Sequence, residues 1–331
     1  MERVLVAQRR ALSALGLLAT LGLSGTASAE DAAAPPPDEI VVYGRGTELV
    51  GQATSGSEGV VGYADIEKRP FSRVGELAEN VPGLIATQHS GEGKANQYFL
   101  RGFNLDHGTD LAGSVDGAPI NMRSHGHGQG YLDLNFLIPE LVERIDYTKG
   151  PYRADKGDFA SAGTLGFTTK SALLAPIAEV TAGTYGYHRA LVAGSTPLGQ
   201  TTLLAALDAA LSDGPWVLDE KLQRFSGLAK VSGANWSLGL TGYASRWNAT
   251  DQVPQRAITS GLIPRTGYID PDLGGRSGRI GLTFNGTFGE TKVTAYAVGS
   301  RLQLTSNFTY FGCGGDKAGH WNAGGVLSVA D

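Results

Sequence analysis

The chain has 331 residues, and its 27 Lys and Arg against 32 Asp and Glu give a formal net charge of −5. Glycine is frequent, with 48 residues, while charged residues make up only 18%. The acidic balance argues against a nucleic-acid-binding protein, which usually presents a basic surface. The single Cys excludes an intrachain disulfide and a multi-cysteine metal site. A glycine-rich, charge-poor chain without helical periodicity favours an all-β architecture.

The N-terminus has the pattern of an export signal. Three arginines in the first ten residues precede a short apolar segment at 11–23 and a small-residue cleavage site at Ala27-Ser28-Ala29. This pattern predicts a secretory signal peptide over residues 1–29, because the apolar segment is too short to span a bilayer. Residues 30–45 follow as a proline-containing tether that ends in a β-branched run. Such a run either lends a strand to another protein's sheet edge or begins the next domain, and the residues alone leave both open.

Residues 46–170 are expected to form a compact α+β domain. Leu77–Leu84 predicts a short helix stopped by Pro82-Gly83, and Tyr98–Phe103 predicts a strand ending near a glycine. Val115-Asp116-Gly117 predicts a tight turn between short strands. Pro139 predicts a helix start that leads into a strand near Ile145.

Residues 171–311 alternate apolar and polar side chains with period two. Ile280, Leu282 and Phe284 give the clearest example. Short turns alternate with longer connections, as in outer-membrane barrels, although a soluble sandwich would show the same alternation. Aromatic residues near strand ends, such as Trp236, Tyr243 and Trp247, are expected at membrane interfaces. About seven strands are predicted: 176–184, 187–196, 201–213, 222–231, 236–247, 278–288 and 292–310.

The order of motifs resembles the TonB-dependent outer-membrane receptors from about residue 38 to about residue 310. The plug motif residues that carry the resemblance are Arg101, Gly102, Phe103, Asp116, Gly117, Gly150 and Pro151. The resemblance implies that Arg101 is buried against acidic groups where the plug meets the barrel, with Gly102 allowing close packing. The resemblance implies an α+β plug domain followed by an incomplete antiparallel transmembrane β-barrel, with about seven of an expected ~22 strands. It also implies a TonB box, the segment that pairs with the periplasmic energy-coupling protein TonB. Its residues would be Glu39, Ile40, Val41, Val42 and Tyr43.

The tail at residues 312–331 departs from the barrel pattern. Alternation stops at Phe311, and the following segment contains Cys313, the only cysteine. An open sheet in lipid would expose an unpaired strand edge. We therefore expect a truncated or frameshifted receptor whose tail is out of frame. The alternative is a natural short variant whose tail is an extracellular loop.

Histidines cluster in the plug segment. His107, Arg123, His125 and His127 are candidate ligand-binding residues, and the three histidines are candidate metal ligands because neutral imidazole commonly binds Zn, Cu and Ni. The alternative is that these histidines line a turn and hydrogen-bond the barrel wall. No cofactor is expected. Nucleophile, zincin and dinucleotide motifs are absent from the sequence, so an enzyme is not predicted.

By resemblance, the predicted function is energy-coupled uptake of a scarce ligand across the outer membrane. The ligand would be a ferric siderophore or another metal chelate, haem or a metal ion. The expected partners are TonB, outer-membrane lipid and the small ligand, with no nucleic acid. Two alternatives remain: a non-transporting fragment that at most binds ligand, and a passive outer-membrane pore.

Overall fold

The computed structural model describes residues 55–88, 91–123, 129–249 and 252–307, and the backbone alone of 321–330. The predicted signal peptide and TonB box lie outside these residues, as do His125 and His127. Among the residues described, none of the helices has the length and apolar character needed to cross a membrane.

The plug domain combines two small sheets with short helical turns. The strand order in the larger sheet is β1-β7-β8-β5-β6, and in the smaller sheet it is β2-β3-β4. The strands are β1 (Glu58–Gly62), β2 (Leu84–Thr87), β3 (Gln97–Leu100), β4 (Phe103–Asn104), β5 (Leu111–Val115), β6 (Ala118–Pro119), β7 (Val142–Lys149) and β8 (Gly163–Thr169). The helical turns are α2 (Tyr63–Ile66), η1 (Val74–Asn80), η2 (Pro139–Leu141) and η3 (Ala154–Lys156).

Apolar side chains fill the space between these elements. Leu77, Leu132 and Leu165 are no more than 1% exposed and belong to one continuous core. The alternating residues of β8 supply part of this core, with Leu165 and Phe167 turned inward and their neighbours half-buried. The plug therefore has a hydrophobic core of its own.

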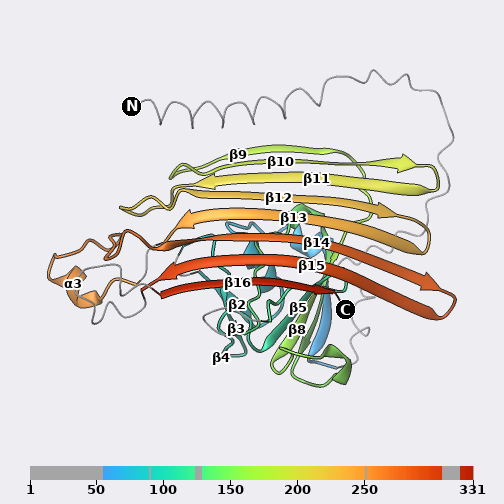
Figure 1. Cartoon of the computed structure of the whole chain (residues 1–331), viewed down its shortest axis with the longest axis horizontal. Coiled ribbons are helices and arrows are strands. Elements are labelled where there is room, and N and C mark those ends of the chain that lie inside the picture. Colours follow the sequence, from blue (N-terminus) through green and yellow to red (C-terminus); the bar gives the residue numbers. More distant parts are fainter. Residues whose placement is uncertain (1–54, 89–90, 124–128, 250–251, 308–320, 331) are drawn as a thin grey trace, which may run out of the picture. The chain divides into compact units, whose positions relative to one another are not determined.

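The remaining strands form one antiparallel sheet in which each strand pairs with the next along the chain. They are β9 (Ile177–Ala182), β10 (His188–Leu198), β11 (Thr201–Ser212), β12 (Leu222–Ser232), β13 (Trp236–Asn248), β14 (Gly274–Phe288), β15 (Thr291–Ser306) and β16 (Trp321–Ala330). Figure 1 shows this order, with the short helix α3 (Gln255–Thr259) in the longest connection. The predicted fold class is confirmed, including all seven predicted strands.

An eighth strand, beyond the seven predicted, lies in the tail, and the out-of-frame origin of this tail stays a prediction. β16 pairs with β15 without a register break, from Ser306–Trp321 to Ala297–Ala330. Its sequence contains two adjacent glycines and little alternation, which is why the period-two pattern did not reveal it. The tail is therefore not devoid of strand structure.

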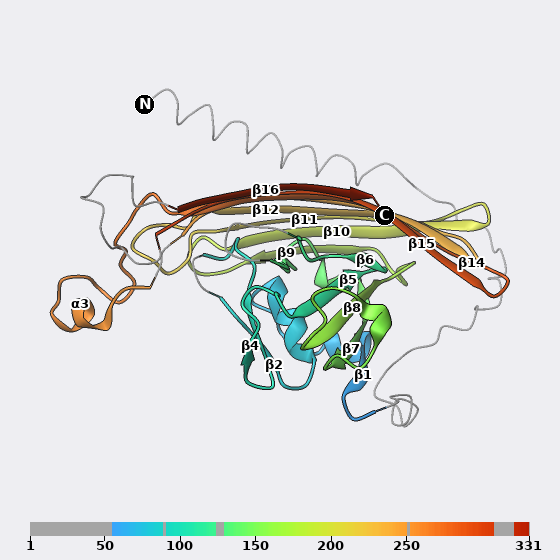
Figure 2. The ribbon, with the colours of Figure 1, turned by 60° about the horizontal axis from the view of Figure 1, so that its bottom comes forward.

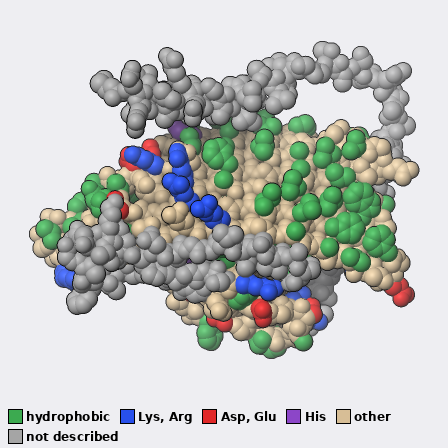
Figure 3. Space-filling view, viewed as in Figure 1, with side chains coloured by type: hydrophobic (Ala, Val, Ile, Leu, Met, Phe, Trp, Pro, Cys, Tyr) green, Lys and Arg blue, Asp and Glu red, His purple; other side chains and the backbone are tan. Residues whose placement is uncertain are grey.

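The two faces of this sheet differ. Figure 2 shows the sheet curving over the plug, with which it forms one compact unit. The outward face carries exposed apolar side chains, among them Leu207, Leu240 and Ile280. Figure 3 shows apolar side chains spread over much of this outward face. An exposed apolar band on alternating strands is the pattern of a lipid-facing barrel wall.

Several local predictions need correction. The helix predicted at Leu77–Leu84 is the 3-10 turn η1, because Pro82-Gly83 ends it and β2 begins at Leu84. The predicted strand at Tyr98–Phe103 ends at Leu100. Tyr243 and Trp247 do not face lipid: both are buried on the inward side, 7% and 4% exposed.

Candidate functional site

A chain of alternating charges connects the plug to the sheet. Glu140 in η2 accepts two hydrogen bonds from the Arg189 guanidinium of β10, at 2.6 and 2.9 Å. Arg189 Nε also donates to Asp208 of β11 at 2.6 Å, and Arg224 of β12 donates to the other Asp208 oxygen at 2.9 Å. Burial alone would raise the pKa of Glu140, but the hydrogen bonds and charge of Arg189 hold it below its ordinary value. Bidentate geometry makes this a strong and directional contact.

A second polar contact involves the predicted plug motif. Lys230 of β12 donates to the Thr169 carbonyl oxygen at 2.9 Å and to the Thr169 hydroxyl at 3.0 Å, with Asp116 at 3.4 Å. Asn285 of β14 donates to the Asp116 carbonyl oxygen at 2.8 Å. Asp116 and Gly117 both have positive φ, 47° and 83°, as a two-residue hairpin turn requires. This turn therefore inserts a hairpin of the plug against the wall.

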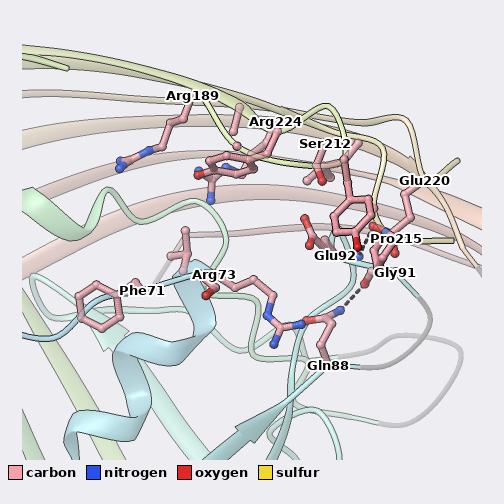
Figure 4. Close-up of a pocket in the computed structure, with 18 of the residues that line it drawn as sticks. Phe71, Arg73, Gln88, Gly91, Glu92, Arg189, Ser212, Pro215, Glu220 and Arg224 are labelled. Atoms are coloured by element: carbon pink, nitrogen blue, oxygen red, sulfur yellow. Dashed lines mark hydrogen bonds between the residues drawn. The ribbon is translucent and has the colours of Figure 1, made fainter. Parts of the chain in front are cut away.

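A cavity of about 1300 Å³ lies between the plug and the end of the sheet that carries the longer connections. We call this end the long-loop end; the opposite, short-turn end carries the turns at 199–200, 233–235 and 289–290. Figure 4 shows Phe71, Arg73, Gln88 and Glu92 of the plug facing Arg189, Ser212, Glu220 and Arg224 of the wall. The cavity thus draws side chains from both parts of the molecule.

Two glutamates lie close together in this cavity. The Glu92 backbone N–H lies 3.4 Å from Glu220 Oε2, and the Trp216 indole donates to Glu220 Oε1 at 2.7 Å. Burial, and next the neighbouring Glu92 charge, raise the pKa of Glu220 to about 7. Burial also raises the pKa of Glu92, against the opposing charges of Arg73 and Arg224. Near neutral pH the pair can therefore both accept and donate hydrogen bonds to a ligand.

A second cavity of about 760 Å³ involves the plug sheet and β15. It is lined by Arg123, Tyr147 and Tyr296, among others. Arg123 is exposed, and it lines this second cavity and not the first.

The surroundings of His107 in the structure differ from those expected of a ligand-binding residue. Its side chain is 1% exposed, and its Nδ1 lies 2.9 and 3.0 Å from the carbonyl oxygens of Ala95 and Asn96. Nε2 faces the Asp106 carboxylate at 3.6 Å. His107 therefore packs in the plug interior, and it lines neither cavity.

The metal site remains a prediction, because two of its three histidines lie outside the described residues. Across the described ranges, no three His, Cys, Asp or Glu side chains are grouped so that they could hold a metal ion.

The remaining motif residues have conformational roles. Arg101 and Gly102 have positive φ, 52° and 83°, and form the turn between β3 and β4. The expectation that Arg101 is buried against acidic groups is wrong: it is exposed and donates to the Ser57 hydroxyl. Gly102 has open space at its Cβ position, so its conformation and not close packing requires glycine. Phe103 is 71% exposed.

Gly150 and Pro151 form the predicted turn after β7. Gly150 has φ 107° and donates its backbone N–H to the Ala162 carbonyl oxygen at 2.7 Å. Pro151 is exposed.

Sequence reasoning missed the wall residues that contact the plug directly or through the charge chain. Arg189, Asp208 and Lys230 fall on inward positions of strands whose other inward residues are largely apolar or small. The signal that could have revealed them is a charged residue in line with apolar or small residues on the same face of a strand. A charge buried on that face needs a partner.

The comparisons with known proteins agree with this arrangement. Residues 51–164 match a family model described as the TonB-dependent receptor plug domain. The unliganded ferric citrate transporter FecA is 13% identical, with a TM-score of 0.59 over 76% of this chain and 40% of that one. The ferric yersiniabactin uptake receptor FyuA from Yersinia pestis is 16% identical, with a TM-score of 0.57 over 76% and 42%. The copper transporter OprC is 17% identical, with a TM-score of 0.54 over 75% and 38%.

At these identities the structural similarities show a shared fold. A plug domain packed against the inner face of a barrel-type wall defines the class of plugged outer-membrane barrels. Residues 51–164 match the TonB-dependent receptor plug domain, and the strands that follow share the fold of part of these receptors' barrels, which confirms the resemblance in the sequence. The chain spans about 40% of the length of the solved structures that it matches.

Proposed function

We propose that this chain belongs to an outer-membrane transporter that takes up a scarce ligand with energy supplied through TonB. The observation that carries the proposal is the pairing of a self-contained plug with a wall that exposes apolar side chains on its other face. The interface between them contains apolar clusters, such as Ile138 and Leu141 of the plug with Leu191 and Leu204 of the wall, and also polar contacts. The hydrogen bonds and ion pairs of this interface can be exchanged for water as the plug moves. Glu140–Arg189 and Lys230–Thr169 are contacts of this kind.

The proposed ligand is a metal chelate, such as a ferric siderophore, or haem or a metal ion. The names of the matched structures support this class, since they include ferric citrate, ferric yersiniabactin and copper transporters. On this proposal the long-loop end of the sheet faces the cell exterior, as in outer-membrane barrels generally. The cavity lined by Arg73, Glu92 and Glu220 then opens toward arriving ligand.

Two proposed segments precede this site in the chain. Residues 1–29 would direct export and be removed, and Glu39–Tyr43 would pair with TonB as an added strand in the periplasm. TonB would transmit force from the inner-membrane proton gradient to the plug.

Deletion of residues 39–43 tests this proposal in cells. Radiolabelled ferric citrate, ferric yersiniabactin and copper(II) serve as probes, and deletion of residues 31–35 in the same tether is the matched control. We expect the 39–43 deletion to abolish uptake while surface binding and protein abundance are kept, and the control to transport normally. Equal uptake by both variants would favour a passive pore. Absence of uptake by the undeleted protein for all three probes would favour a non-transporting fragment.

A further inference from the structure

Three arginines stand apart on the outward face of the sheet. Across the outward positions of β10 to β15, the charged side chains are Arg246, Arg276 and Arg301, and all three are exposed. We call them the outer arginine triad. Figure 3 shows basic side chains gathered on this face beside the field of apolar side chains. Their strands, β13, β14 and β15, are consecutive neighbours.

The strand register brings the triad together. Arg246 lies directly opposite Arg276, and Arg276 lies opposite Gln303. Arg301 pairs with Gly278, which puts it diagonal to Arg276. Directly opposed side chains have Cβ atoms about 5 Å apart, and diagonal ones are about 7–8 Å apart. Three guanidinium groups therefore lie within reach of one small anion-bearing group.

Nothing within the described residues neutralises this charge. Arg246 Nε donates to the neutral Gln223 side chain at 3.0 Å, and no carboxylate among the described residues forms an ion pair with Arg246, Arg276 or Arg301. Like charges directly opposed on a sheet destabilise the pairing. The opposed Arg246 and Arg276 therefore reduce the stability of the bare sheet, and an external anion would relieve their repulsion.

The triad borders an apolar surface on one side only. Moving from Arg276 toward the short-turn end, the outward residues of β14 are Gly278, Ile280 and Leu282. The row through Gly278 contains Arg301, and the row after it contains Leu207 and Ile280 and no charged residue. Ile280 is four residues from Arg276, or about 13 Å along the strand. A ligand suited to this surface has an anionic head and long apolar chains.

We propose that the outer arginine triad binds the phosphate groups of a phosphorylated lipid whose acyl chains lie on the adjoining apolar rows. Guanidinium groups bind phosphate oxygens bidentately, and each binds phosphate more specifically than an ammonium does. The position of the lipid in the outer leaflet rests on the proposed outer-membrane location, because the triad lies at the long-loop end. Such a lipid would pin this part of the wall at the membrane surface, beside the connection at 249–273 that contributes to the ligand cavity.

A lipid titration tests this site without any transport assay. Full-length protein in mild detergent is titrated with diphosphoryl lipid A and with an uncharged, phosphate-free diacylglycerol, and bound lipid is counted by native mass spectrometry. The test variant is Arg246→Gln/Arg276→Gln/Arg301→Gln. The matched control, Lys68→Gln/Arg256→Gln/Lys292→Gln, removes three exposed charges elsewhere. The test variant should fold at least as well as wild type, because it removes like-charge repulsion, and its thermal unfolding verifies this.

We expect the test variant to bind diphosphoryl lipid A about a hundredfold more weakly, from three charges each worth about fivefold. The control variant should bind as wild type does. Equal binding by the test and control variants would overturn the site. Equal binding of the phosphate-free lipid by wild type would overturn phosphate recognition. Full displacement by millimolar inorganic pyrophosphate would show a free-anion site and overturn the lipid assignment.

The proposed transport function fails by a different observation, which is loss of any dependence of uptake on residues 39–43. A protein that binds the phosphorylated lipid but transports none of the metal probes would retain the lipid site and lose only the transport proposal.

Discussion

The plug domain buries its apolar side chains in its interior, whereas the eight-stranded sheet carries apolar side chains on both of its faces. The plug buries leucines such as Leu77 and Leu132 in its own interior. The sheet exposes Leu240 and Ile280 on its outward face and turns charged residues such as Asp208 toward the plug. The plug therefore has an interior core and a largely polar exterior, whereas the outward face of the sheet has the apolar pattern of a barrel wall. The surface where they meet combines apolar clusters with polar contacts such as Glu140–Arg189.

The largest effect on this arrangement should come from Asp208→Asn. The Asp208 carboxylate is fully buried between Arg189 and Arg224, so its neutralisation leaves two buried guanidinium groups with one carboxylate. We expect the free energy of unfolding by urea, measured in lipid, to fall by about 4 kcal/mol. The exposed Asp219→Asn variant in the neighbouring connection is the control and should change little. A change below 1 kcal/mol for Asp208→Asn would mean that the charge chain is hydrated and contributes little.

Paired leucine truncations sharpen the comparison directly. Leu77→Ala removes a side chain with 0% exposure from the plug core and should destabilise the plug by about 3 kcal/mol. Leu240→Ala removes a side chain that is 47% exposed on the outward face. Lipid tails are as apolar as leucine and fill the space, so its effect in a bilayer should be much smaller. Hydrogen exchange of plug amides in both variants measures this, and equal effects would contradict the assignment of the two faces.

A moderate effect is expected from Lys230→Met, which keeps the length of the side chain but removes its three donors. Thr169 and Asp116 then lose a buried partner on the wall, at a cost of about 2 kcal/mol. Amide exchange should increase in the hairpin at Asp116–Pro119, while the plug core at Leu77 stays protected. The exposed Lys292→Met is the control. Unchanged exchange in the hairpin would show that Lys230 does not hold the plug.

The smallest effect concerns Asp133, which accepts hydrogen bonds from the Asn135 backbone at 2.9 Å and from the Ser277 hydroxyl of β14 at 3.3 Å. Burial raises its pKa to about 6. A carboxyl with a raised pKa binds its proton more tightly in the folded state, so its contribution to stability is present at low pH and is lost as pH rises through about 6. Because the side chain is only half-buried, we expect about 1 kcal/mol.

Urea unfolding of wild type and Asp133→Asn between pH 4 and pH 7 isolates this contribution, because the other carboxyl groups cancel in the difference. The difference should change steadily over this range in favour of Asp133→Asn at higher pH. Asp158→Asn, exposed on the plug, should give a flat difference. A flat difference for Asp133→Asn would contradict the raised pKa.

The sequence predicts the elements of this fold better than their contacts. Period-two alternation located β12 within one residue, 222–231 expected against Leu222–Ser232 observed. The Asp116-Gly117 turn was predicted from its residue types, since only a few of them adopt two successive positive φ angles. β16 was not predicted, because Gly324 and Gly325 interrupt its apolar pattern.

The site depends on pairs that are far apart in the chain. Glu92 and Glu220 are 128 residues apart, and Lys230 and Asp116 are 114 residues apart. The alternation in the sequence predicts which face of a strand carries a charged residue. The plug residue that contacts this charge depends on how the plug packs against the wall, which the alternation does not predict. The role of Arg101 was misjudged for the same reason: its positive φ places it in an exposed turn, which a family motif alone does not reveal.

The most direct test of energy-coupled transport separates binding from uptake in the same cells. Cells that produce the protein are given radiolabelled ferric citrate, ferric yersiniabactin or copper(II), with and without a protonophore that collapses the inner-membrane proton gradient. We predict that the protonophore leaves surface binding of the transported probe unchanged and abolishes its uptake, as deletion of residues 39–43 does. Uptake that continues at the same rate without the gradient would contradict energy coupling and identify a passive pore.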